Sequence, residues 1–352
     1  MACVLHLISQ LEEGGAQRQL SYIARFSLKY EVEVASLIAS PPDKLFPYFR
    51  QPEVPVHFLS QSSDFYAPEI LPALRSLLSK RNYDLVHCRL YSAIVQGVFA
   101  SRLESIPCVA SPGSMLEMLR VDGNKKWERV LIARALRNAD SVFFPSHSSA
   151  LAFFDAGWVE RDRVRTIWNG VDIEHFRPQG RGDALVAIGR ISSEKAYGDL
   201  DHIFQLLRGR FPQIRCIVAG GGARNHRSSG IEFAGYVDDV REILARARIF
   251  ISTSKTEGMN NALLEAQAMG IPAVVRRIGS NSEVIENGVN GFLAGSPEEF
   301  ADCCALLMQD QDLCGEMGSA ARAKMGKEFS IQKQVQKIES MYDQLLGANA
   351  PA

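Results

Sequence analysis

Short apolar runs alternate with amphipathic segments of helical length along most of this chain, and no other feature constrains its fold as strongly. An apolar run of about four to eight residues followed by such a segment is the pattern of a βα unit, and successive units build a parallel sheet. The sequence therefore predicts an α/β protein made of two Rossmann-like, doubly wound domains. The predicted strands are residues 3–8, 31–37, 85–88, 108–111 and 141–145, and then 184–188, 215–219, 231–234, 249–252 and 273–276.

A segment rich in glycine and proline, residues 169–183, separates the two series of strands. We therefore predict an N-terminal domain over residues 1–172 and a C-terminal domain over residues 173–330. Apolar residues at helical spacing within 331–352 predict a closing helix that packs back on the N-terminal domain. Ligands of doubly wound sheets bind beyond the carboxyl ends of the strands, so we expect the site in a cleft between the domains.

The composition argues against several classes of protein. The 352 residues carry a net charge of -1, so no bulk charge favours a nucleic-acid partner. The seven cysteines are odd in number and lack zinc spacing, which argues against a disulfide framework or a structural metal and favours a reducing cytoplasm. No uncharged apolar stretch of about 18 residues occurs, so we expect no membrane-spanning helix. The N-terminus lacks the charged region of a signal peptide and reads as a buried strand.

The most informative segment runs from Glu257 to Pro272 and reads EGMNNALLEAQAMGIP. It follows a predicted strand, so its first residues form a loop at the carboxyl edge of the sheet, and a helix begins near Asn260. Glu257 then lies in the loop, and Glu265 lies about one and a half turns into the helix. Asn260 or Asn261 can cap this helix, and its first backbone N–H groups suit a phosphate.

This segment resembles the E-x7-E motif of retaining GT-B glycosyltransferases, specifically glycosyltransferase family 4 (group 1). Asn260 stands where proline is usual in the best-fitting members. The resemblance implies that Glu257 contacts the donor sugar and that Glu265 binds the ribose hydroxyls of a nucleotide sugar. The alternative is a surface glutamate in a loop and a solvated glutamate on a helix. The resemblance also implies donor contacts for Gly258, Met259, Asn260, Asn261 and Ala262.

A second motif, Gly-Arg-Ile-Ser-Ser-Glu-Lys at residues 189–195, follows another predicted strand. Its two cations, Arg190 and Lys195, suit the negative charge that grows on a leaving diphosphate. Taken alone, they also fit a solvated basic turn. The family carries Gly-Arg and Glu-Lys-Gly at this place, so the resemblance assigns both cations to the diphosphate. Ala196 replaces the usual glycine, which predicts a stiffer or shifted loop.

The first predicted strand leads into Gly14-Gly15 and then into a helix that carries Arg18. Paired glycines let the backbone approach a ligand closely at a helix start. By resemblance, Gly14 and Gly15 face the donor phosphates and Arg18 faces the acceptor. The segment lacks the Gly-x-Gly-x-x-Gly fingerprint of dinucleotide-binding proteins, which argues against NAD.

Three further residues resemble donor-site positions, and one departure concerns the acceptor. Tyr236 and Val237 lie in the string FAGYVDDV, which resembles the family loop that touches the nucleotide base, and Glu283 occupies a motif position near the ribose. Many family members have a histidine after the fourth strand of the N-terminal domain, but the comparable string here, ASPGSMLE, has none. Ser114 and Glu117 in that string are therefore our candidates for acceptor contacts.

A basic and apolar segment lies between residues 123 and 139. On a helix, its cations and apolar side chains form faces that suit an anionic lipid surface. The alternative is an ordinary core-facing helix with a solvated basic side. Family members of this kind often act on lipid-linked acceptors, so a peripheral contact with the inner face of the plasma membrane is one expectation. The residues concerned are Lys125, Lys126, Arg129, Arg134 and Arg137, interleaved with Trp127, Val130, Leu131 and Ile132.

Together these features predict a retaining glycosyltransferase that moves a sugar from a nucleoside-diphosphate donor, with a UDP-sugar favoured, to a hydroxyl of a glycan, lipid-linked glycan or small molecule. We expect no metal and no cofactor, because the two cations take the place of a metal at the diphosphate. Three alternatives stay open. They are a nucleotide-sugar epimerase on the same scaffold, a non-catalytic nucleotide-sugar-binding subunit, and an NAD-dependent oxidoreductase, which the first glycine loop disfavours.

Overall fold

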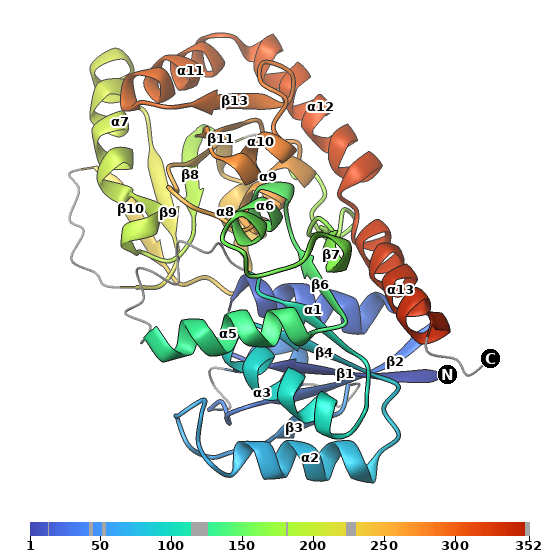
Figure 1. Ribbon diagram of the computed structural model, residues 1–352. Helices are drawn as coiled ribbons and strands as arrows, with labels where there is room; N and C mark the ends of the chain where they lie inside the picture. Colours follow the sequence, from blue (N-terminus) through green and yellow to red (C-terminus); the bar gives the residue numbers. More distant parts are fainter. Residues whose placement is uncertain are drawn as a thin grey trace. The chain divides into compact units, whose positions relative to one another are not determined.

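The computed structural model describes residues 1–12, 14–41, 45–50, 54–113, 126–180, 182–222 and 230–348. Its contacts divide the chain into unit 1, which comprises Met1–Gly170 and Ile331–Ala352, and unit 2, which comprises Val171–Ser330. Each unit holds one parallel sheet with helices packed against it (Figure 1). The predicted α/β fold class, with two Rossmann-like domains, is therefore confirmed.

Unit 1 contains a sheet of seven strands: β1 Ala2–Ile8, β2 Tyr30–Ser36, β3 Val56–Phe58, β4 Leu85–Arg89, β5 Cys108–Ser111, β6 Ser141–Phe144 and β7 Val164–Thr166. Their order is β3-β2-β1-β4-β5-β6-β7, and every pair is parallel. The sequence analysis missed β3 and β7, the two edge strands. Three residues carry too little alternation of apolar and polar side chains to be recognised as a strand.

Helices cover both faces of this sheet. Their bounds are α1 Gly15–Phe26, η1 Pro47–Arg50, α2 Ile70–Lys80, α3 Tyr91–Leu103, α5 Lys126–Asn138, α6 His147–Asp155, η2 Arg161–Arg163 and α13 Ile331–Ala348. Leu5 and Leu7 of β1 pack in one core with α2, α3 and α5, whereas Val4 packs in another with α1 and α13. Successive side chains of a strand point to opposite faces, so the alternation in β1 places these helices on opposite sides.

The final helix, α13, is tied to unit 1 by polar as well as apolar contacts. The Glu339 carboxylate accepts hydrogen bonds from the backbone N–H groups of Leu28 and Lys29, both at 2.9 Å, and from the Ser27 hydroxyl at 3.0 Å. These three donors follow α1 directly, so Glu339 fixes the turn between α1 and β2. None of the helices in the described part of the chain combines the length and apolarity that a membrane crossing needs.

Unit 2 contains a sheet of six strands: β8 Ala184–Ile188, β9 Cys216–Ala219, β10 Ile231–Gly235, β11 Ala247–Ser252, β12 Ala273–Arg276 and β13 Gly291–Ala294. Their order is β10-β9-β8-β11-β12-β13, again all parallel. The strand order reverses between β8 and β11, and in doubly wound sheets ligands bind in the crevice at such a switch point. The loops that leave β8 and β11 are therefore the first place to look for a site.

The helices of unit 2 are η3 Ser193–Lys195, α7 Tyr197–Arg210, α8 Val240–Leu244, α9 Asn261–Ala268, α10 Gly279–Val284, α11 Pro297–Gln309 and α12 Gln311–Glu328. Apolar residues of α7, α11 and α12 share one core with the strands (Figure 1). Glu257 lies in the loop between β11 and α9, as the sequence predicts. The structure adds β13, a short edge strand that the sequence analysis did not predict.

Candidate active site

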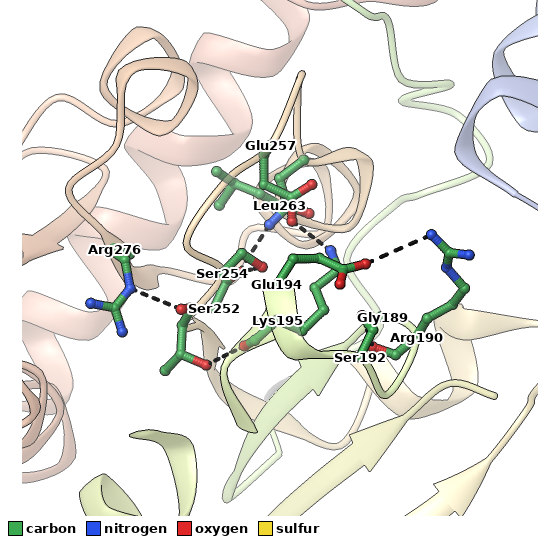
Figure 2. A network of polar contacts seen from close by, with 12 residues as sticks. Gly189, Arg190, Ser192, Glu194, Lys195, Ser252, Ser254, Glu257, Leu263 and Arg276 are labelled. Carbon is green, nitrogen blue, oxygen red and sulfur yellow. Dashed lines mark hydrogen bonds and ion pairs between the residues drawn. The ribbon is translucent and has the colours of Figure 1, made fainter. Parts of the chain in front are cut away.

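Lys195 and Glu257 meet at the switch point of the unit 2 sheet. Lys195 ends η3 after β8, and its Nζ lies 2.5 Å from Oε1 of Glu257, in the loop after β11 (Figure 2). Their side chains are only 18% and 14% exposed. Salt screens such a sheltered pair less than it screens a surface salt bridge. An anion that reaches Nζ therefore competes with the Glu257 carboxylate for the same charge.

A second cation, Arg190, lies on the same loop but is open to solvent. Its side chain is 76% exposed, and its Nη2 lies 3.8 Å from Oε1 of Glu194. Burial opposes ionisation of Glu194, but its own backbone N–H, the Ser192 hydroxyl and the Arg190 charge hold the pKa of this carboxyl below its ordinary value. Glu194 is thus an anion at neutral pH and steadies Arg190, whose exposed guanidinium can turn toward a ligand.

Tyr197 fixes the turn between β8 and this loop. The Tyr197 hydroxyl donates a hydrogen bond to the carbonyl oxygen of Gly189 at 2.8 Å. Burial, with the Glu257 charge adding to it, raises the pKa of Tyr197 above its ordinary value. The phenol therefore keeps its proton, and with it this hydrogen bond, across the physiological range.

The helix after Glu257 begins as the sequence predicts. Asn260 is its cap: its side chain accepts a hydrogen bond from the Leu263 N–H at 3.2 Å and donates one to the Ser252 hydroxyl at 3.1 Å. Gly258 and Met259 are buried beside it, and Asn261 and Ala262 form the first turn. Asn260 thus fixes the start of α9 against the end of β11, in a place where proline could make neither hydrogen bond.

Glu265 lies in the second turn of α9 and is only 3% exposed. A solvated helix residue, the alternative reading of this glutamate, is therefore wrong. Glu257 is likewise sheltered, so the alternative of a surface loop residue fails for it too. A buried carboxylate is costly unless it is paired or hydrogen-bonded, and Lys195 is such a partner for Glu257.

Glycines after β9 let two loops of this site touch. A Cβ atom on Gly220 would lie 2.0 Å from the carbonyl oxygen of Gly189, and one on Gly222 would lie 2.7 Å from that of Ile191. The Ile191 N–H donates to the carbonyl oxygen of Gly221 at 2.8 Å. The glycine run is therefore a contact surface for the loop that carries the cations, and not a flexible turn.

We expect Gly220→Ala to destabilise unit 2 by about 1–3 kcal/mol, because the methyl group overlaps Gly189 and the φ of +150° at Gly220 disfavours any side chain. Gly221→Ala is the matched control, since a Cβ there has no neighbour within 4 Å. Thermal denaturation of the two variants measures the difference. Equal midpoints would show that the two loops move apart at no cost.

Sequence comparison reveals what kind of protein carries this arrangement. The profile described as "Glycosyltransferase Family 4" matches residues 13–175, and the profile described as "Glycosyl transferases group 1" matches residues 182–310. Together they account for most of both units. The chain belongs to the group 1 glycosyltransferases.

Individual relatives of this glycosyltransferase are distant. The UDP-Gal:alpha-D-GlcNAc-diphosphoundecaprenol alpha-1,3-galactosyltransferase of Escherichia coli is 25% identical over 305 residues, which are 77% of this chain and 78% of that protein. A D-inositol 3-phosphate glycosyltransferase of Arthrobacter is 27% identical, over 82% of this chain and 75% of its own length. N-acetyl-alpha-D-glucosaminyl L-malate synthase of Bacillus anthracis is 33% identical, but over 40% of this chain and 37% of that protein.

Solved structures with the same fold include HepE of Anabaena, crystallised in complex with UDP. It superimposes with a TM-score of 0.84 over 98% of this chain and 100% of its own, at 21% identity. Sucrose-phosphate synthase of Thermosynechococcus elongatus gives a TM-score of 0.80, over 99% of this chain and 100% of its own, at 15% identity. These neighbours establish the GT-B fold.

The remaining residues of this glycosyltransferase that are predicted to contact the donor lie on separate elements of unit 2. Tyr236 is half exposed and follows β10, where Gly235 has a φ of +71°, and Val237 is partly buried beside it. Glu283 is partly buried in α10. Both the loop and the helix follow the carboxyl ends of strands in the unit 2 sheet, β10 and β12.

The predicted residues of the N-terminal domain belong to unit 1. Gly14 precedes α1 as its cap, Gly15 is its first residue, and Arg18 is partly buried one turn later. The strand–glycine–helix order predicted from the sequence is therefore correct. Ser114 and Glu117, the candidates for acceptor contacts, lie outside the described residues.

The sequence analysis missed several residues that support the loops of Lys195 and Glu257. Thr253 and Ser252 at the end of β11, and Arg276 at the end of β12, contact the loops that carry the ion pair. The run Ser252-Thr253-Ser254 directly after an apolar strand was a usable signal, because hydroxyl groups at a strand end can fix the adjoining loop. Arg276 had no local signal of this kind.

Proposed function

We propose that this glycosyltransferase moves a sugar from a UDP-sugar to a hydroxyl of its acceptor, with retention at the anomeric carbon and without a metal ion. The observation that carries the proposal is the Lys195–Glu257 pair, sheltered at the switch point of the unit 2 sheet next to the start of α9. The Lys195 cation and the start of α9 suit a diphosphate. The Glu257 carboxylate suits sugar hydroxyls.

The choice of UDP is supported by relatives. HepE of Anabaena was crystallised with UDP and, separately, with UDP-glucose. The Escherichia coli relative is named for UDP-Gal as its donor. In the proposed complex, Glu265 holds the ribose with Glu283 nearby, and the Tyr236–Val237 loop lies against the base. The family resemblance assigns Gly14 and Gly15 to the donor phosphates and Arg18 to the acceptor, and these assignments belong to the same proposal.

The reaction breaks the bond between the anomeric carbon and the diphosphate oxygen and forms a bond to the acceptor oxygen on the same face of the sugar. The bond-breaking leaves negative charge on the diphosphate, which Lys195 and Arg190 stabilise. The acceptor hydroxyl gives up its proton, and the departing phosphate oxygen is the base that takes it. Glu257, released from Lys195 as the diphosphate binds there, holds the sugar hydroxyls.

The charges of the same site support the proposed metal independence. The Asp199-Leu200-Asp201 string has the spacing of a metal-binding carboxylate pair. Asp199 is ion-paired with Arg276, which satisfies its charge without a metal. We propose that the two cations of the loop after β8 stabilise the negative charge of the diphosphate, as a metal ion would.

A turnover assay tests this proposal. The protein is incubated with UDP-galactose or UDP-glucose and EDTA, with lipid-linked and free glycan acceptors, and the product is examined by NMR. We expect a product whose anomeric configuration equals that of the donor. Conversion of the donor without any acceptor would point to an epimerase instead. Nucleotide binding with no turnover on any acceptor would point to a non-catalytic subunit, and an inverted product would contradict retention.

We further propose that the acceptor is a glycan or lipid-linked glycan reached from an anionic membrane surface, on the cytoplasmic side where free cysteines persist. The support lies on α5 and α6 of unit 1. Ile132 and Leu136 of α5 face the core, but the solvent side of this helix is not simply basic. Its exposed stripe begins with Trp127, Val130 and Leu131, of which Val130 is 66% exposed, and it continues with Arg134 and Arg137.

The end of α6 extends the same kind of surface. Leu151 and Phe154 of α6 are exposed, and the Arg161 guanidinium lies over the Phe154 ring at 5.6 Å. Arg137 of α5 donates to the carbonyl oxygen of Gly157, so the two helices are joined there. Exposed apolar side chains among cations are typical of surfaces that lie on anionic lipid. Lys125, the first cation of the predicted set, lies outside the described residues.

Vesicle sedimentation tests the membrane contact. We expect the protein to bind vesicles that contain phosphatidylglycerol and not vesicles of phosphatidylcholine alone, because each cation near an anionic surface contributes about 1 kcal/mol. Val130→Asp is expected to weaken the binding about tenfold. Leu306→Asp is the matched control, an exposed leucine on α11 of unit 2. Equal binding of the protein to both kinds of vesicle would contradict the proposed membrane contact. Equal binding of Val130→Asp and Leu306→Asp to the anionic vesicles would contradict it as well.

A further inference from the structure

The buried hydroxyl of Thr253 joins the two loops that carry the ion pair. Thr253 follows β11 and is 4% exposed. Its Oγ1 donates to the carbonyl oxygen of Lys195 at 2.8 Å and also lies 3.2 Å from that of Ala196. A second link runs from the Lys255 N–H to the carbonyl oxygen of Glu194 at 2.8 Å. The backbone that presents Lys195 is thus attached at two points to the backbone that presents Glu257.

Arg276 holds Thr253 in turn. Its Nε donates to the carbonyl oxygen of Thr253 at 2.8 Å, and its Nη2 is ion-paired with Asp199 in the first turn of α7. The guanidinium also lies over the Phe300 ring at 5.9 Å, and its side chain is largely buried. Arg276 therefore ties the ends of β11 and β12 to the helix that follows the Lys195 loop.

The Lys195 loop needs such support because it is strained. Ala196, the residue after Lys195, has φ +51° and ψ +46°, the left-handed conformation that an alanine adopts at a cost of about 1 kcal/mol or more. A strained conformation persists when surrounding contacts determine it. The Thr253 hydroxyl accounts for this at Ala196, since it contacts the carbonyl oxygens of the peptide groups before and after the Ala196 Cα, those of Lys195 and Ala196.

We propose that Thr253 and Arg276 are positioning residues, which hold the Lys195 ammonium where the donor diphosphate is bound. The inference rests on the proposed function for the identity of the ligand. Neither side chain touches the ligand in this proposal. They act through Lys195, because a displacement of about 1 Å of a charged group in a preorganised site can lower a rate about 10²-fold.

Thr253→Val removes the hydroxyl and keeps the shape of the side chain, whereas Thr253→Ser keeps the hydroxyl. UDP binding is measured by calorimetry for both variants, in the wild-type background and in Lys195→Ala. We expect Thr253→Val to raise the Kd for UDP about tenfold and Thr253→Ser to change it less than twofold. In the Lys195→Ala background, the effect of Thr253→Val should fall below twofold, because the group that it positions is gone.

The outcomes distinguish a failure of the positioning role from a failure of the proposed function. A Thr253→Val effect of the same size in both backgrounds, or no effect in either, overturns the positioning role while UDP binding by the wild type upholds the proposed function. If Thr253→Val does not fold, Asp199→Asn, which weakens the hold on Arg276, takes its place with the same non-additive result expected.

If the folded wild type binds no UDP, the proposed function fails by itself. The positioning role is then judged from the NMR chemical shift of the ¹³C-dimethyl groups on Lys195. This chemical shift should differ from that of the wild type in Thr253→Val and not in Thr253→Ser, and a chemical shift that is the same in both variants overturns the inference.

Discussion

Lys195→Ala is expected to lower the turnover of this glycosyltransferase about 10²- to 10³-fold, the usual consequence of removing one preorganised charge from a site where negative charge develops. Lys195 is the sheltered cation of the site, and the loss falls mainly on kcat because the diphosphate charge grows as the sugar departs. Arg190 does not compensate for this loss, since it has its own place at the diphosphate in the proposed complex, and solvent screens its largely exposed charge more than that of Lys195.

Steady-state kinetics with saturating acceptor measure this loss. The matched control is Lys255→Ala, which removes an exposed lysine from the loop that carries Glu257. We expect Lys255→Ala to keep turnover within about twofold of the wild type, since exposed charges contribute little. Near wild-type turnover in Lys195→Ala would exclude Lys195 from the diphosphate site, whatever the control shows.

Glu257→Gln is expected to change binding and turnover in opposite directions. The carboxylate that we propose to hold the sugar becomes a neutral amide, and loss of a charged hydrogen-bonding group of this kind costs about 10- to 10²-fold in turnover. The same change frees Lys195 from its partner 2.5 Å away. The diphosphate of UDP then no longer competes with a carboxylate for Nζ, so we expect UDP to bind about tenfold more tightly.

Calorimetry with UDP and kinetics with the full donor separate the two effects. Glu286→Gln, an exposed glutamate after α10, serves as the control for the loss of one negative charge from unit 2. It should leave both quantities near their wild-type values. Weaker UDP binding in Glu257→Gln would mean that Glu257 supports the Lys195 loop and does not compete with the ligand.

The sequence was sufficient to predict the scaffold and the loops and helices on which the candidate site residues of unit 2 lie. Long apolar runs such as residues 3–8 are unambiguous strands in an α/β pattern, and the strand–loop–helix order placed Glu257 and Asn260 correctly. The strands it missed, such as Val56–Phe58, lie at sheet edges and are too short to show a period. Their formation depends on pairing with a neighbouring strand, which no local pattern records.

The pairing of side chains across loops could not be predicted. Lys195 and Glu257 are 62 residues apart, and Asp199 and Arg276 are 77 apart. Whether such groups meet depends on rotamers and loop paths that the sheet topology determines. The glycine run after β9 is similar: the sequence permits a flexible turn. In the structure, a Cβ atom on Gly220 would lie only 2.0 Å from the carbonyl oxygen of Gly189, which reveals a packed contact.

The central claim, that unit 2 binds the nucleotide of a UDP-sugar through Glu265 without a metal, is tested most directly by calorimetric titration of the protein with UDP, GDP and ADP in EDTA. Glu265→Gln is measured beside the wild type, because it removes the charge of this buried side chain and keeps its volume. The account predicts that UDP binds most tightly and that Glu265→Gln weakens its binding about tenfold or more. Folded wild-type protein that binds none of the three nucleotides, or UDP binding that is unchanged in Glu265→Gln, would contradict it.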